Sequence, residues 1–80
     1  MNFVVYSKQD CQYCSKIKMV LELTGSTFVV YNLDEDFTKE EFYSEFGENS
    51  SFPQVMCGDK KLGGSVETIK YLREHSMIFT

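Results

Sequence analysis

The pattern of apolar and polar residues along the 80-residue chain predicts alternating strands and helices. Runs rich in β-branched and aromatic residues at 2–6 and 27–33 indicate two strands. Between them, four residues at helical spacing predict a helix with one inner face: Ile17, Val20, Leu21 and Thr24. Gly25 supplies the left-handed conformation that commonly ends a helix. Because a helix of this length joins the two strands, we expect them to be parallel, with a right-handed crossover.

A capping pattern marks the start of a second helix. Thr38 and Glu41 have the spacing of a capping box, and Phe37 and Phe42 occupy the two positions of a hydrophobic staple. This is the clearest local signal in the chain, and it predicts a helix over residues 39–46.

The last third of the chain predicts a hairpin and a final helix. Residues 53–57 and 60–62 indicate short strands, and Gly58-Asp59 between them suits a tight turn. Ser65 is the expected N-cap of a helix with the apolar stripe Val66, Ile69 and Leu72. The order βαβαββα resembles a thioredoxin-like α/β fold, a four-stranded mixed sheet flanked by three helices, although another small α/β sheet also fits the periodicity. We expect a single domain over residues 1–80.

Composition and charge exclude several classes of protein. A net charge of −4 argues against nucleic-acid binding, because phosphate contacts need clustered Lys and Arg. No apolar stretch approaches membrane-spanning length, and the N-terminal run is too short and wrongly flanked for a signal peptide. Three cysteines are too few for the disulfide framework of a small secreted domain. We therefore expect a cytoplasmic protein that binds neither nucleic acid nor membrane.

Cys11 and Cys14 form the motif with the clearest chemistry. Side chains three residues apart on a helix lie about 5–6 Å from each other, so a relaxed first turn can bridge two thiols. Cys11 is the expected nucleophile, because unpaired N–H groups at a helix start and a nearby cation, Lys8, lower the pKa of a thiol. The adjacent Asp10 acts in the opposite direction. Cys14, one turn deeper, is the expected resolving thiol that attacks a mixed disulfide formed at Cys11.

The remaining thiol and the single histidine favour structural interpretations. Cys57 alternates with Val55 and is most simply a buried core thiol. His75 is expected to be exposed or packed near the end of the last helix. A zinc site built from these two residues with Cys11 and Cys14 is the weaker alternative, because the second pair lacks the close spacing of structural sites.

Two further segments have both a structural and a functional interpretation. A cis bond before Pro53 would leave the backbone of Phe52 free to pair with an extended substrate, and an ordinary trans proline at a sheet edge is the alternative. Gly63-Gly64 would let the backbone approach a ligand, with the following helix start receiving a carboxylate. A strand end followed by a capped helix explains the same residues.

Taken together, three segments of the chain resemble a dithiol glutaredoxin: Tyr6-Ser7-Lys8 before Cys11-Gln12-Tyr13-Cys14, then Phe52-Pro53-Gln54-Val55, then Leu62-Gly63-Gly64-Ser65. The resemblance implies the thioredoxin-type fold, the cis bond, and glutathione lying across the site with its sulfur against the first cysteine. It also implies that Phe52 pairs with the tripeptide backbone, while Ser65 and Val66 receive the γ-glutamyl carboxylate. The implied activating and glutathione-binding residues are Lys8, Tyr13, Phe52, Pro53, Gly64, Ser65 and Val66.

The resemblance implies an activity as well. It is the reduction of protein disulfides and glutathione mixed disulfides, with glutathione as co-substrate and no tightly bound cofactor or metal. The implied partners of the monomer are glutathione and disulfide-containing clients, with ribonucleotide reductase among them.

Three positions depart from the family pattern. Val66 stands where an aspartate is usual, and residues 39–46 offer no Arg or Gln for the glycyl carboxylate, so weaker glutathione binding is expected. Gln12 replaces the common proline, as in members that bridge an iron–sulfur cluster. Two alternatives stay open. One is a redoxin reduced by a thioredoxin-reductase-type enzyme and donating electrons to ribonucleotide reductase, a group that Gln9-Asp10-Cys11 also resembles, and the other is an iron–sulfur cluster carrier.

Overall fold

The computed structural model describes residues 2–75, and its elements follow the expected βαβαββα order. The strands are β1 Asn2–Ser7, β2 Thr27–Asn32, β3 Gln54–Cys57 and β4 Lys60–Gly63, and the helices are α1 Gln12–Leu23, α2 Lys39–Phe46 and α3 Ser65–Glu74. Within the described part of the chain, no helix is long and apolar enough to cross a membrane. The expected fold class is confirmed.

The four strands form one mixed sheet in the order β2-β1-β3-β4. β1 and β2 are parallel, with Val5 opposite Val30, as the crossover through α1 requires. β3 runs antiparallel to β1, with Val5 opposite Val55, and also antiparallel to β4. Pro53 therefore lies just before an interior strand, so the edge-strand alternative for this proline is wrong.

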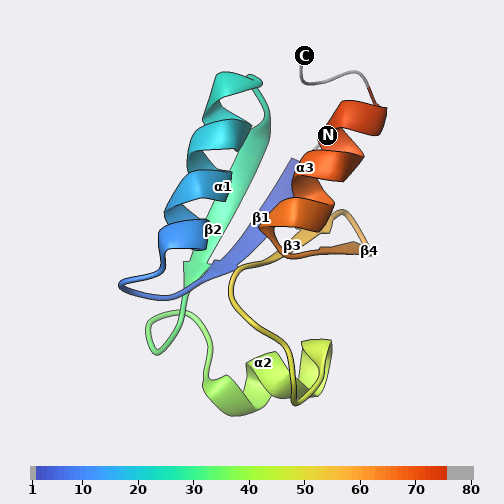
Figure 1. The fold of residues 1–80 in the computed structure, drawn as a ribbon. Coiled ribbons are helices and arrows are strands. Elements are labelled where there is room, and N and C mark those ends of the chain that lie inside the picture. Colours follow the sequence, from blue (N-terminus) through green and yellow to red (C-terminus); the bar gives the residue numbers. More distant parts are fainter. Residues whose placement is uncertain (1, 76–80) are drawn as a thin grey trace.

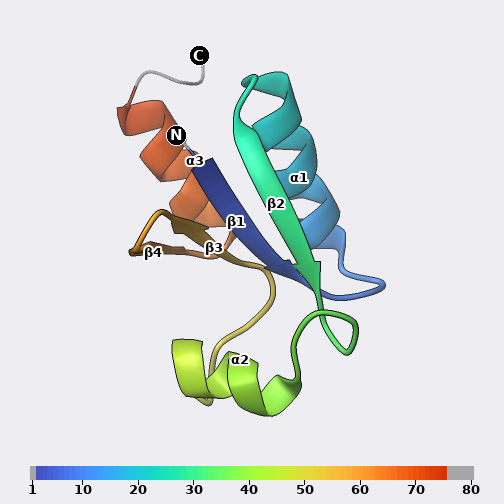
Figure 2. The ribbon, with the colours of Figure 1, turned by 180° about the vertical axis from the view of Figure 1, so that it is seen from behind.

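Helices α1 and α3 cover one face of the sheet, as Figures 1 and 2 show from opposite sides. Alternate residues of β1 point to these helices, and Phe3, Val5 and Ser7 are fully buried. The apolar core on this face contains Phe3, Val5, Ile17, Leu21, Val55 and Leu72. The expected inner face of α1 is confirmed at Ile17 and Leu21, which are fully buried, and Val20 packs against the core.

Helix α2 lies beyond the ends of β1 and β2 rather than over the face covered by α1 and α3 (Figures 1 and 2). Its predicted capping box is present, because Glu41 N–H donates to Thr38 Oγ1 at 3.1 Å and Thr38 N–H donates to Glu41 Oε1 at 2.9 Å. The staple is present too, with the rings of Phe37 and Phe42 stacked at a centroid distance of 5.8 Å. Local sequence chemistry thus sets both the start and the anchoring of α2.

The expected cap of α3 is wrong. The N-cap is Gly64, and Ser65 is the first helical residue. Gly64 N–H donates to Glu67 Oε1 at 2.8 Å, which is the half of a capping box that needs no side chain on the cap residue.

The expected apolar stripe of α3 is also partly wrong. Val66 is 71% exposed, whereas Leu72 is fully buried and Ile69 packs against the core. At about 100° per residue, position 66 is turned about 120° away from Leu72, while Ser65 and Thr68 are within about 40° of it. Both of these polar residues are accordingly buried.

Candidate active site

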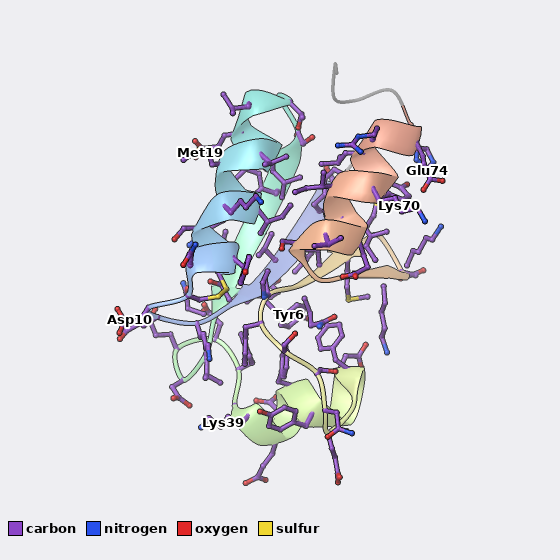
Figure 3. The ribbon with its side chains drawn as sticks, viewed as in Figure 1. Tyr6, Asp10, Met19, Lys39, Lys70 and Glu74 are labelled. Atoms are coloured by element: carbon purple, nitrogen blue, oxygen red, sulfur yellow. A yellow bond between two sulfur atoms is a disulfide. The ribbon has the colours of Figure 1, made fainter. Side chains whose placement is uncertain are left out.

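The two expected redox cysteines lie at the start of α1, where the chain leaves β1. Cys11 is the N-cap residue with an extended backbone, and Cys14 lies in the first turn. They form a disulfide with Cα atoms 5.2 Å apart, drawn in Figure 3 as the yellow bond at the base of α1. The prediction that the first turn can bridge this pair is confirmed.

The two sulfurs have unequal surroundings. Cys14 is 1% exposed, whereas Cys11 is partly exposed and accepts a hydrogen bond at its Sγ from Cys14 N–H at 3.2 Å. The Cys11 disulfide sulfur occupies the position that the Cys11 thiolate would take in the reduced protein. An N–H donor at a helix start favours that anion over the neutral thiol. Asp10 precedes it as an exposed residue at φ +55°, a left-handed conformation that aspartate tolerates.

Phe52 and Pro53 line one cavity together with Tyr13, the residue that precedes Cys14. Their peptide bond is cis, as the resemblance implied, and Pro53 is buried. The Lys8 ammonium lies 5.4 Å from the centroid of the Phe52 ring, within reach of a cation–π interaction. Lys8 was expected beside the nucleophile, and this contact places its charge over the Phe52 ring.

A cavity of about 220 Å³ joins the start of β3 to the start of α3. Its lining consists of Tyr13, Ser51, Phe52, Pro53, Gly64, Ser65, Val66 and Glu67. Every glutathione-contact residue predicted from the resemblance is in this lining except Lys8. The fold thus brings together three segments that are far apart in the sequence.

The sequence model of the glutaredoxin family matches residues 3–62 of the chain. The chain belongs to the glutaredoxin family. Glutaredoxin-C6 of Oryza sativa subsp. japonica is 31% identical over 78 residues, which cover 94% of this chain and 70% of that protein. A glutaredoxin of Vernicia fordii is also 31% identical over 78 residues, covering 94% and 75%. The expected activity, that of a glutathione-dependent thiol–disulfide oxidoreductase with a CxxC active site, is the activity of this family.

Solved structures agree with the family assignment. The buckwheat glutaredoxin–glutathione complex has a TM-score of 0.78 and 25% identity, and the match covers 94% of this chain and 71% of that chain. Reduced Escherichia coli glutaredoxin has a TM-score of 0.82 and 19% identity over 98% and 100% of the two chains, a likeness of fold.

Glu67, which was not among the predicted site residues, also lines the cavity between β3 and α3. Gly63 and Gly64 make room for its side chain, because a Cβ at Gly63 would lie 3.0 Å from Glu67 Cβ and a Cβ at Gly64 would lie 3.1 Å from Glu67 Oε1. Gly63 also has φ +110°, which favours glycine. The glycine pair therefore serves this carboxylate, and the spacing from Gly64 to Glu67 was the available signal.

Cys57 lies far from the redox pair along the sheet. It is opposite Phe3 at the start of β1, whereas Cys11 follows the end of β1. Cys57 is half-buried rather than fully buried as expected, because it packs at the border of the core, with its Sγ 3.9 Å from the Tyr71 hydroxyl. This contact raises the pKa of Tyr71, and burial adds to the effect. His75 is exposed and stacks on Tyr71 at 4.0 Å, away from the cysteine pair with which the zinc alternative joined it.

Proposed function

We propose that Cys11 is the nucleophile and Cys14 the resolving thiol in glutathione-linked reduction of protein disulfides and glutathione mixed disulfides. The difference between the two sulfurs supports this division of roles. Cys11 is accessible and faces a helix-start N–H, whereas Cys14 is 1% exposed. An incoming disulfide can therefore reach only the first sulfur without local opening of the helix.

Reduction of a client proceeds by two thiol–disulfide exchanges. The Cys11 thiolate attacks one client sulfur, forming a mixed disulfide and releasing the other client sulfur as a thiolate, which takes a proton from water. Cys14 then loses its proton, and its thiolate attacks the Cys11 sulfur, which closes the Cys11–Cys14 disulfide. The second client sulfur leaves as a thiolate and takes up a proton. The client gains two electrons, and the protein loses two.

Two glutathione molecules return these electrons. The first thiolate attacks the Cys11 sulfur and releases Cys14. The second attacks the resulting mixed disulfide, releasing the Cys11 thiolate and oxidised glutathione. No tightly bound cofactor takes part in this cycle.

The cavity between β3 and α3 is the proposed glutathione site. The backbone N–H groups of Ser65 and Val66 belong to the first turn of α3, where N–H groups lack helical partners and bind carboxylates. Tyr13, 56% exposed, offers its ring at the mouth of the cavity. Phe52 lies opposite and would pair with the tripeptide backbone, with Lys8 above its ring. The buckwheat relative, crystallised with glutathione, supports this assignment.

Two features predict weak glutathione binding. Val66 presents an exposed aliphatic side chain where a carboxylate would attract the glutathione ammonium. Glu67 already accepts the hydrogen bond from Gly64 N–H, so its negative charge faces the incoming γ-glutamyl carboxylate. These features favour the thioredoxin-reductase-fed redoxin as the second candidate.

The deciding experiment compares electron sources for the same client. We expect turnover with glutathione plus glutathione reductase. Turnover with thioredoxin reductase and none with glutathione would replace the glutathione-linked proposal with the redoxin alternative. Cys14→Ser should keep activity on glutathionylated substrates and lose it on protein disulfides, whereas Cys11→Ser should lose both. Loss of both activities in Cys14→Ser would contradict the proposed roles.

The biological setting is proposed on the same basis. Ribonucleotide reductase is a candidate client, and a cytoplasmic monomer is the form that we expect. Purification under anaerobic conditions tests the remaining alternative, because a cluster carrier would be coloured and would form a cluster-bridged dimer.

A further inference from the structure

A second cavity, of about 320 Å³, lies among β1, β2 and α2. Its walls are aromatic and its remaining lining side chains are carboxylates: Tyr6, Tyr31, Phe37 and Phe42, with Asp36, Glu41 and Glu45. We refer to these seven residues as the acidic aromatic pocket. None of them belongs to the cysteine site or to the proposed glutathione site.

Tyr6 is the central ring of the acidic aromatic pocket, and Figure 3 shows it between the sheet and α2. Its ring centroid is 5.6 Å from that of Tyr31 and 5.2 Å from that of Phe37, with interplanar angles of 71° and 69°. Rings held nearly perpendicular present π faces in different directions. Such an arrangement can surround a cation, because each face carries negative electrostatic potential.

The carboxylates give the pocket an excess of negative charge. Glu45 pairs with Lys61 at 3.5 Å. Asp36 and Glu41 each accept one backbone N–H, at 2.8 and 2.9 Å, and neither forms an ion pair with another residue in the described range 2–75. The pocket therefore holds two carboxylates whose charge a bound cation would neutralise.

An aromatic stack connects this pocket to the cysteine site. Phe42 and Phe37 stack on Phe52 at centroid distances of 4.1 and 6.2 Å. Phe52 in turn lies beside Pro53 and under the Lys8 ammonium. A polypeptide that pairs with Phe52 at the active site thus lies next to residues that also wall the pocket.

We propose that the acidic aromatic pocket binds an arginine side chain of a disulfide-containing client protein. Arginine fits better than lysine, because its planar guanidinium both stacks on aromatic rings and pairs with carboxylates through several donors. The pocket would then select clients with an arginine near the reducible disulfide. This inference rests on the proposed reduction of client disulfides at Cys11.

The first test is single-turnover reduction of two disulfide peptides that differ only by arginine or its neutral isostere citrulline. The protein is reduced with dithiothreitol beforehand, so the result does not depend on glutathione. We expect the arginine peptide to react about fivefold faster at low salt, the size of a partly exposed cation–π and ion-pair contact. Equal rates for the two peptides would overturn the proposal.

Matched variants separate the pocket from overall charge. Asp36→Asn with Glu41→Gln removes two charges while keeping an acceptor oxygen for each backbone N–H. The preference should fall to about twofold, the part that the aromatic rings alone supply, without loss of the capping box. Glu22→Gln with Glu74→Gln removes the same charge from exposed positions and should keep the preference. Figure 3 shows Glu74 at the end of α3 farthest from α2. Equal loss in both double variants would overturn the proposal.

A binding measurement tests the pocket without any reduction step. The oxidised protein is titrated with the cysteine-free peptides acetyl-Gly-Arg-Gly-amide and its citrulline counterpart, followed by amide NMR shifts. We expect shifts at Tyr6, Tyr31 and Glu41 with the arginine peptide alone. The absence of these shifts would refute the site, whereas a protein that binds here but fails in the glutathione assay would contradict only the proposed electron donor.

Discussion

Replacing Phe42 with alanine should destabilise the protein by about 3–4 kcal/mol, the range for removing a buried aromatic ring. Phe42 is 1% exposed and is the single buried residue of α2. It stacks on Phe52 at 4.1 Å with rings only 10° from parallel, and it also contacts Phe37 and Phe46. An 80-residue domain has a free energy of unfolding of about 4–12 kcal/mol, so one substitution removes a large part of it.

Urea unfolding measures this loss directly. With a slope of about 1 kcal/mol per molar for a domain of this size, the Phe42→Ala midpoint should fall by about 3 M. Leu23→Ala is the matched control, because Leu23 is 80% exposed and its truncation should cost less than about 0.5 kcal/mol. A loss below about 1 kcal/mol for Phe42→Ala would refute the conclusion that this ring anchors α2.

Three further substitutions test the glutathione site and the acidic aromatic pocket. Val66→Asp should lower the KM for glutathione about two- to fivefold, because it adds an exposed carboxylate that attracts the glutathione ammonium. An unchanged KM would contradict the assigned cavity. Glu67→Gln keeps an acceptor for Gly64 N–H but removes the charge, so KM should fall about twofold; a rise would mean that Glu67 attracts glutathione. Burial, and then the charges of Tyr31 and Glu45, raise the pKa of Tyr6 above its usual value of about 10. As pH rises, the Tyr6 phenol ionises first in the unfolded chain. The contribution of Tyr6 to the free energy of unfolding is therefore present below about pH 10 and is lost as pH rises through the pKa of Tyr6 in the folded protein. Tyr6→Phe should therefore lose less stability than the native protein between pH 9 and 11, as urea unfolding would measure.

The sequence predicted those elements whose limits depend on local chemistry. Helix α2 spans the expected residues 39–46, because Thr38 and Glu41 satisfy each other's backbone within one turn. The inner face of α1 also followed from spacing, and Gly25 has the expected left-handed φ of +70°. The redox pair could be predicted because its two cysteines lie in the first turn of a helix that the sequence already predicts.

The start of α3 could not be predicted in the same way. Propensity favours Ser65 over Gly64 as an N-cap. The structure reverses this order because Gly63 and Gly64 leave the space in which the Glu67 side chain folds back. That space depends on how β4 meets α3, and in the sequence only the spacing from Gly64 to Glu67 indicates it. Val66 is exposed for a different reason, because it lies about 120° around the helix from the buried Leu72 wherever the helix begins.

The acidic aromatic pocket was invisible in the sequence for a different reason. Its rings come from β1, β2, and α2 with the loop before it, so they meet only through the tertiary fold. By themselves in the sequence, the acidic residues predict nothing more than a solvated face, because runs of charge usually have that role. Their place beside Tyr6 and Tyr31 is what makes them a candidate binding surface.

The protein's negative charge should act in opposite ways on the two substrates of the cycle. Glutathione carries a net negative charge at neutral pH, so Glu67 and the protein's net charge of −4 oppose its approach. A client arginine is instead attracted by Asp36 and Glu41. Salt screens both effects, since the Debye length falls from about 30 Å at 0.01 M to about 8 Å at 0.15 M. Added salt should therefore raise kcat/KM for glutathione and lower the rate with the arginine peptide, and salt dependences of the same sign would show that these carboxylates do not distinguish reductant from client.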